Sequence, residues 1–217
     1  MLYVTIAGEG VENMDKGIAV INIFGEVEGH NSLPGGAKTT KYEEIIPWCA
    51  GIELNDDIKG VLVLINTTGG DVESGLSIAE ALASVSKPVV TVVLGGGHSI
   101  GVPLAVAGDY SFIVKTATMI VHPIRVAGVT LGARQNFYYI EKMQDRIIDF
   151  IVSHSDITED QVKALMFNTK ELSKDIGSVL VGAQAVRCGI IKSEGGVSDA
   201  VNKLYDLIKN ENDSRIS

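Results

Sequence analysis

Residues 89–107 read VVTVVLGGGHSIGVPLAVA and carry the clearest fold pattern of the chain. The apolar run at 89–94 predicts a buried strand, and the small apolar residues at 101–107 predict a buried helix. The glycines between them predict a sharp strand-to-helix turn that carries Ser99. Such a turn exposes a side chain, and nearby backbone N–H groups point toward the place where negative charge would develop during a reaction. Ser99 is therefore a candidate nucleophile.

Two other segments show a strand that ends in chemically useful residues. The apolar run at 61–66 ends in Gly69-Gly70, which offers unencumbered N–H groups at the start of an amphipathic helix. The run at 117–121 is followed directly by His122. Because sites of α/β proteins gather at strand termini, we expect this histidine near the serine. An imidazole titrates near neutrality, so it can accept the serine proton and pass it on.

The whole chain is expected to be one α/β domain, residues 1–217. With 217 residues and 46% hydrophobic content, it can bury one sizeable core. Repeated strand-then-helix units favour an α/β layer fold. We expect flexible ends at 1–17 and 209–217 and a mobile loop at 25–41. The expected strands are 18–24, 61–66, 89–94, 110–114 and 119–122, and the expected helices are 42–50, 72–85, 101–107, 135–153, 158–167 and 198–208.

Charge and cysteine content exclude several classes of function. The net charge of −9 and the lack of a Lys/Arg cluster argue against nucleic acid or an anionic membrane as the main partner. Cys49 and Cys188 lie far apart, which predicts neither a disulfide framework nor a metal site. No signal peptide or membrane span is expected, so the predicted location is cytoplasmic.

Three segments in this order and spacing resemble a known family. Residues 65–70, 97–101 and 119–123 look like the proteolytic subunit of the Clp protease, ClpP. The resemblance covers roughly residues 18–205. It implies a ClpP/crotonase-type fold of repeated strand-strand-helix units, in which the helix at 135–153 is a protruding handle.

The resemblance also implies a serine endopeptidase that needs no cofactor. Ser99 would attack the scissile carbonyl, and His122 would act first as base and then as acid. Asp175 would orient the imidazole, which completes a Ser-His-Asp triad. The backbone N–H groups of Gly70 and Ile100 would form the oxyanion hole.

Further segments refine the resemblance. Residues 182–191 look like the last active-site segment of the family, and Asp175 precedes them, about two positions from the family's aspartate. His98 stands where the family usually has a small residue, and we expect it to line or support the pocket rather than to act as base. The runs 95–103 and 122–125 most resemble a bacterial branch called the translocation-enhancing, TepA-like proteins.

The helix at 135–153 bears on assembly. Its apolar residues recur at helical spacing and form a stripe that one small domain is not expected to cover, although it could pack on its own core. By resemblance, the helix would stack two rings of identical subunits and enclose the sites in a chamber. Peptides or unfolded proteins would be substrates, and a separate ATP-driven unfoldase is a candidate partner. The stripe consists of Ile140, Met143, Ile147 and Ile151.

Two rival functions stay open at this stage. A crotonase-like enzyme acting on acyl-CoA would also use backbone N–H groups as an oxyanion hole, but it would not need the serine and histidine in this order. The other rival is a catalytically inactive ClpP-like scaffold. Asp160 and Asp199 are alternatives to Asp175, although helix starts already explain both.

Overall fold

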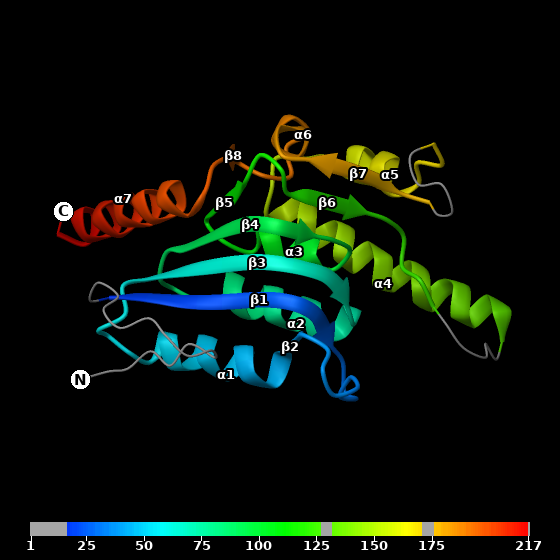
Figure 1. The fold of residues 1–217 in the computed structure, drawn as a ribbon, viewed down its shortest axis with the longest axis horizontal. Helices are drawn as coiled ribbons and strands as arrows, with labels where there is room; N and C mark the ends of the chain where they lie inside the picture. Colours follow the sequence, from blue (N-terminus) through cyan, green and yellow to red (C-terminus); the bar gives the residue numbers. More distant parts are fainter. Residues whose placement is uncertain (1–16, 127–131, 171–175, 217) are drawn as a thin grey trace.

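The computed structural model describes residues 17–126, 132–170 and 176–216 (Figure 1). An eight-stranded sheet has the order β2-β1-β3-β4-β5-β8, with β6 joined to β4 and β7 joined to β6. Every pairing is parallel except that of β6 with β7. The α/β fold class is confirmed. The strands are β1 (Ile18–Glu28), β2 (Thr39–Lys41), β3 (Gly60–Gly70), β4 (Val89–Gly97), β5 (Tyr110–Ile113), β6 (Thr118–Val121), β7 (Ser178–Val181) and β8 (Ser193–Glu194).

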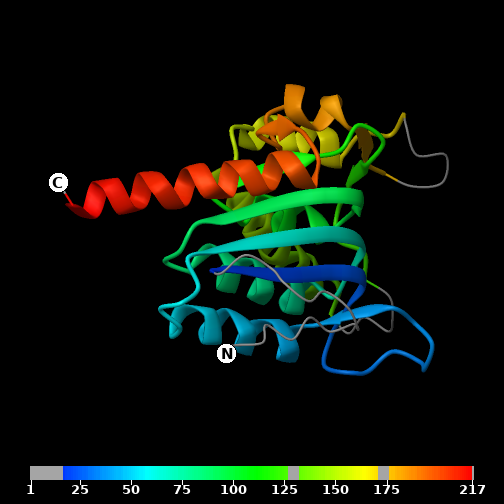
Figure 2. The ribbon, with the colours of Figure 1, turned by 60° about the vertical axis from the view of Figure 1, so that its left-hand side comes forward.

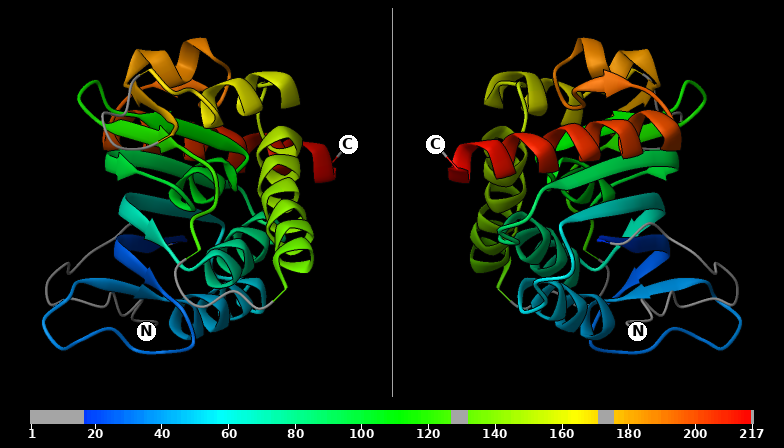
Figure 3. Two further views of the ribbon diagram at one scale, coloured as in Figure 1. Left: turned by 90° about the vertical axis from the view of Figure 1, so that its right-hand side faces the viewer. Right: turned by 90° about the vertical axis from the view of Figure 1, so that its left-hand side faces the viewer.

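Helices cover both faces of this sheet, as Figures 2 and 3 show. Because side chains alternate along a strand, Ala19 and Ile21 of β1 pack in the larger core with α1, α2 and α3. Ile18 and Val20 pack in a second core with α7. The helices are α1 (Tyr42–Glu53), α2 (Val72–Ala83), α3 (Gly101–Val106), α4 (Ala133–Ser153), α5 (Glu159–Met166), α6 (Ala183–Arg187) and α7 (Val197–Ile216).

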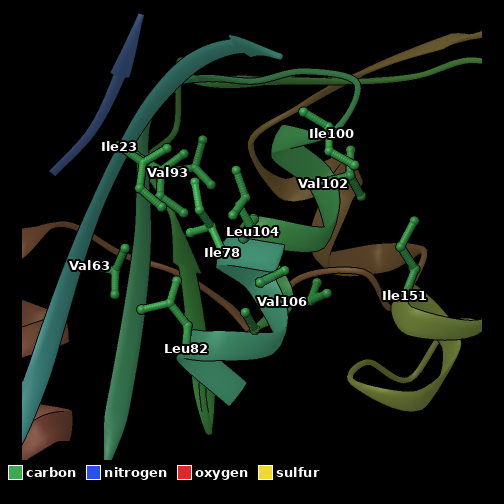
Figure 4. Packing of buried hydrophobic residues seen from close by; sticks show 14 of the residues in the cluster. Ile23, Val63, Ile78, Leu82, Val93, Ile100, Val102, Leu104, Val106 and Ile151 are labelled. Carbon is green, nitrogen blue, oxygen red and sulfur yellow. The ribbon is translucent and has the colours of Figure 1, made fainter. Parts of the chain in front are cut away.

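The larger core fixes the two segments that carry Ser99. Ile78 and Leu82 of α2 and Leu104 of α3 are fully buried and point toward the sheet (Figure 4). Val93 of β4 lies in the same cluster. Each fully buried side chain of this size contributes about 2 kcal/mol through the hydrophobic effect. The strand before the serine and the helix after it are therefore both held by packing.

Two boundaries differ from the sequence expectations. The segment 25–41, expected as a mobile loop, contributes its first residues to β1 and its last three to β2. Gly25 has φ +75° where the register of β1 against β3 shifts, so the strand continues past the glycine. Helix α7 continues to Ile216, beyond the expected end at residue 208. Polar residues without Gly or Pro can continue a helix. Residues 1–16 lie outside the described part.

Three of the four residues in the apolar stripe of α4 are covered by their own chain, and Ile140 is half-buried. Met143, Ile147 and Ile151 are buried, and α4 contacts α3 and α5. The expectation that these residues need a partner surface is wrong, because packing within the subunit already removes them from water. Aromatic residues in the N-terminal half of α4 are exposed instead, where the helix projects past the sheet (Figure 1). They are Phe137, Tyr138 and Tyr139, with exposed fractions of 63%, 54% and 60%.

Candidate active site

Ser99 lies in the predicted sharp turn between β4 and α3. Its φ is +57°, and it is the only non-glycine residue with positive φ in the described part of the chain. This left-handed conformation costs about 1 kcal/mol or more for a residue with a side chain. Neighbouring strands hold it, because the Ser99 N–H donates to the Ile120 carbonyl at 2.9 Å and the His98 N–H donates to the Thr67 carbonyl at 3.2 Å.

The end of β3 passes directly against this turn. Gly69 has φ +92°, and a Cβ atom on it would lie 2.7 Å from the Ser99 Cβ. Gly70 has φ +151°, and a Cβ atom there would lie 2.2 Å from the Val27 carbonyl oxygen. Only glycine fits at both positions. The glycine pair therefore allows the backbone of β3 to approach the serine.

The candidate residues share one cavity of about 230 Å³. Ser99 and His122 line it, and so do Gly70 and Ile100, the residues expected to form the oxyanion hole. Their catalytic roles stay predictions, but the structure brings four of the five predicted residues to one place. The remaining lining residues are mostly apolar: Thr68, Val72, Val102, Val121, Pro123, Ile124, Arg125, Ile147, Ile151 and Met166.

His122 follows β6 and is held by its own backbone neighbour. Its Nδ1 lies 2.7 Å from the Pro123 carbonyl oxygen. A carbonyl oxygen only accepts, so Nδ1 is the donor in this contact, and in the neutral ring Nε2 is then the nitrogen with the lone pair. This is the tautomer that a general base needs. Within the described residues no hydrogen bond joins Ser99 to His122, and such contacts are often long before substrate binds.

Asp175 lies outside the described residues. The chain just after it is described, and a Cβ atom on Gly177 would lie 2.8 Å from the His122 Cβ. This segment therefore packs against the candidate base. The two alternative aspartates do not line the cavity. Asp199 accepts the Gly196 N–H at 2.8 Å, and Asp160 is exposed in the first turn of α5.

His98 does not line the cavity. Its Nε2 lies 2.8 Å from the Thr118 hydroxyl at the start of β6. Burial and, to a smaller extent, the nearby His122 hold the pKa of His98 below its ordinary value. The ring therefore contacts β6 rather than the cavity.

The arrangement of Ser99 and His122 suits acyl transfer. In the described ranges no three His, Cys, Asp or Glu side chains gather as a metal site. Helices α2 and α3 begin within two residues of Gly70 and Ile100, which line the cavity. A hydroxyl, an imidazole with a free Nε2 and two backbone segments in an apolar cavity are the parts that hydrolysis of a peptide bond requires.

Comparison with known proteins decides the family. The sequence matches the model of the Clp protease family over residues 19–193. This chain belongs to the Clp protease family. It is 50% identical over 200 residues to "Translocation-enhancing protein TepA" of Halalkalibacterium halodurans, which covers 92% of this chain and 78% of that protein. The resemblance inferred from the motifs is confirmed.

More distant relatives carry the protease name. The chain is 29% identical over 136 residues to "ATP-dependent Clp protease proteolytic subunit 1" of Chlamydia pneumoniae, over 58% of this chain and 71% of that one. It is also 29% identical over 131 residues to "ATP-dependent Clp protease proteolytic subunit" of Leuconostoc citreum, over 57% of this chain and 65% of that one.

None of the helices in the described ranges is long and apolar enough to cross a membrane.

Proposed function

We propose that this protein is a serine endopeptidase that hydrolyses peptide bonds of peptides or unfolded polypeptides. The observation that carries the proposal is the shared cavity. Ser99, in its left-handed turn, lines this cavity together with His122, whose Nε2 is free to act as base. Membership of the Clp protease family supports the same chemistry.

In the proposed mechanism His122 acts first as base and then as acid in each of two half-reactions. His122 Nε2 takes the Ser99 proton as Oγ attacks the carbonyl, and it then protonates the leaving amine. The N–H groups of Gly70 and Ile100 stabilise the oxyanion, and loss of one such donor typically costs about 3 kcal/mol. In the second half-reaction His122 takes a proton from the water that attacks the acyl-enzyme and returns it to Ser99 Oγ as the acid product leaves. Asp175 orients the imidazole, supported by the contact of Gly177 with His122.

We also propose that the sites lie in a chamber formed by rings of identical subunits in the cytoplasm. The exposed aromatic residues 137–139 on the projecting half of α4 are the surface that would join subunits. The relatives named ATP-dependent proteolytic subunits favour a separate ATP-driven unfoldase as partner. The 50% identity to a translocation-enhancing protein favours substrates among exported proteins.

Hydrolysis of one test protein in two states examines this function. A stable folded protein should be spared, whereas the same protein, permanently unfolded by reduction and alkylation, should be cut. Ser99→Ala should abolish cutting. The control is Ser84→Ala, which removes an exposed hydroxyl that donates to the Ala81 carbonyl, and it should cut like the parent. Equal cutting of both states would rule out the chamber. No cutting of the unfolded state by a folded, assembled preparation would favour the inactive scaffold.

A further inference from the structure

His98 and Thr118 join the two segments that carry Ser99 and His122. The imidazole Nε2 lies 2.8 Å from the Thr118 hydroxyl. Strands β4 and β6 pair at only one described position, Gly96 opposite Thr118. The backbone connection between the serine turn and the histidine strand is therefore short. The side-chain hydrogen bond adds to this pairing and to the bond from the Ser99 N–H to the Ile120 carbonyl.

The His98 residue is held from several sides. Its N–H donates to the Thr67 carbonyl of β3 at 3.2 Å, and its carbonyl accepts the Gly101 N–H of α3 at 2.8 Å. Its ring lies close over Gly96, where a Cβ atom would meet the ring Cε1 at 3.1 Å. Backbone and ring together tie His98 to β3, α3 and β6. These contacts of His98 therefore restrict the position of the next residue in the chain.

The residue that follows is Ser99, whose backbone is strained. A left-handed non-glycine residue persists only where its surroundings hold it. His98 does not line the cavity, so it acts through Ser99 rather than on substrate. Burial, and to a smaller extent His122, keep the pKa of His98 below its ordinary value, which favours a neutral ring beside a base that must become cationic.

We propose that His98 is a positioning residue: its hydrogen bond to Thr118 holds the Ser99 turn against β6 and so sets the direction from which the hydroxyl attacks. The effect on turnover rests on the proposed function. The effect on the turn does not rest on that function. It can be measured at the Ser99 N–H, which is hydrogen-bonded to the Ile120 carbonyl.

Amide hydrogen exchange at Ser99 tests the attachment without any need for activity. His98→Ala and Thr118→Val should each raise the exchange rate at Ser99 about tenfold. The double variant should exchange no faster than either single variant, because both remove the same bond. Thr118→Ser keeps the hydroxyl and should stay near the parent rate. The control is His30→Ala, which removes an exposed ring bonded to Tyr42. Unchanged exchange in both single variants would overturn the proposal.

Steady-state kinetics on an unstructured peptide then separates positioning from a merely structural role. His98→Ala should lower kcat at least tenfold with KM within about twofold. His98→Gln, whose amide reaches a position close to that of Nε2, should recover part of kcat. A loss that appears only in KM, or no recovery by His98→Gln and Thr118→Ser, would contradict a positioning role. If the parent protein hydrolyses nothing, the proposed function fails, and the exchange rates still decide the attachment.

Discussion

The backbone N–H of Ser99 donates a hydrogen bond of 2.9 Å to the carbonyl oxygen of Ile120. The chain reaches His122 two residues after this acceptor. The candidate nucleophile and the candidate base are therefore both attached through the backbone to one strand, β6. Their relative position is set before any substrate enters the cavity, which is the preorganisation that acyl transfer needs.

Asp175→Asn tests the third member of the triad. If Asp175 orients His122, the amide will favour the wrong tautomer, and kcat should fall by about 10⁴-fold while folding is unaffected. Asp160→Asn, an exposed residue of α5, is the matched control and should behave as the parent. Near-normal activity of Asp175→Asn would instead assign the orienting role to the Pro123 carbonyl, which already bonds Nδ1. The measurement is kcat with a fluorogenic peptide.

Gly69→Ala tests the close approach of β3 to the serine. The added Cβ would lie 2.7 Å from the Ser99 Cβ at a residue with φ +92°, so the serine must move. A displacement of this kind is expected to lower kcat/KM about 100-fold. Gly35→Ala is the control, because nothing lies within 4 Å of the added atom. A Gly69→Ala protein with parent kcat/KM would show that the glycine is not needed at the site.

Much of the fold can be predicted from local pattern. The apolar runs before Gly69 and Ser99 are long enough to indicate buried strands, and the glycines after them indicate turns. Local pattern does not predict β7, whose four residues Ser178–Val181 pair antiparallel with β6. The stripe that includes Met143 and Ile147 shows the limit of periodicity. It identifies an apolar face of a helix but not which surface covers that face.

The site could be predicted only where side-chain chemistry marks it. Ser99 and His122 are reactive residue types at the ends of apolar runs. The Pro123 carbonyl on Nδ1 left no signal, because every residue has a carbonyl. Likewise His98 was visible in the sequence, but its partner Thr118 depends on how β4 meets β6. Contacts between segments distant in the chain require the folded structure.

Glu73 and Arg146 provide a test of how α2 holds α4. The carboxylate oxygens lie 2.7 and 3.1 Å from the two terminal guanidinium nitrogens. The hydrogen bond from Arg146 holds the pKa of Glu73 below its ordinary value. Because the pKa of Glu73 is lower in the folded state, the ion pair contributes its whole stabilisation at pH values above the ordinary pKa. That stabilisation is lost as the pH falls through the pKa of the folded state. Since both side chains are about half exposed, Glu73→Gln should cost about 1 kcal/mol or less at pH 7.

Urea unfolding at fixed protein concentration measures this difference. The free energy of unfolding of Glu73→Gln should approach that of the parent protein as pH is lowered to about 3, below the ordinary carboxyl pKa. Glu159→Gln removes a pair within α5 and serves as control. If the difference in free energy of unfolding between Glu73→Gln and the parent grew as the pH fell, the pair would not stabilise the fold in the way described.

Variants on the projecting half of α4 test assembly. Phe137→Glu combined with Tyr138→Glu places charge on the exposed aromatic surface and should lower the molar mass measured by light scattering. Leu54→Glu, at a residue 86% exposed after α1, is the control and should keep the parent mass. If the double variant keeps the full mass of the parent assembly, this surface does not join subunits.

Covalent labelling shows whether Ser99 is the nucleophile. A fluorophosphonate reacts only with a serine activated by its surroundings, and mass spectrometry locates the adduct. We predict one adduct on Ser99, absent in Ser99→Ala and retained in Ser84→Ala. The His122→Ala protein, which lacks the base, should label at least about 100-fold more slowly. An adduct on another serine, or none from the folded and assembled protein, would contradict the assignment of Ser99 as nucleophile.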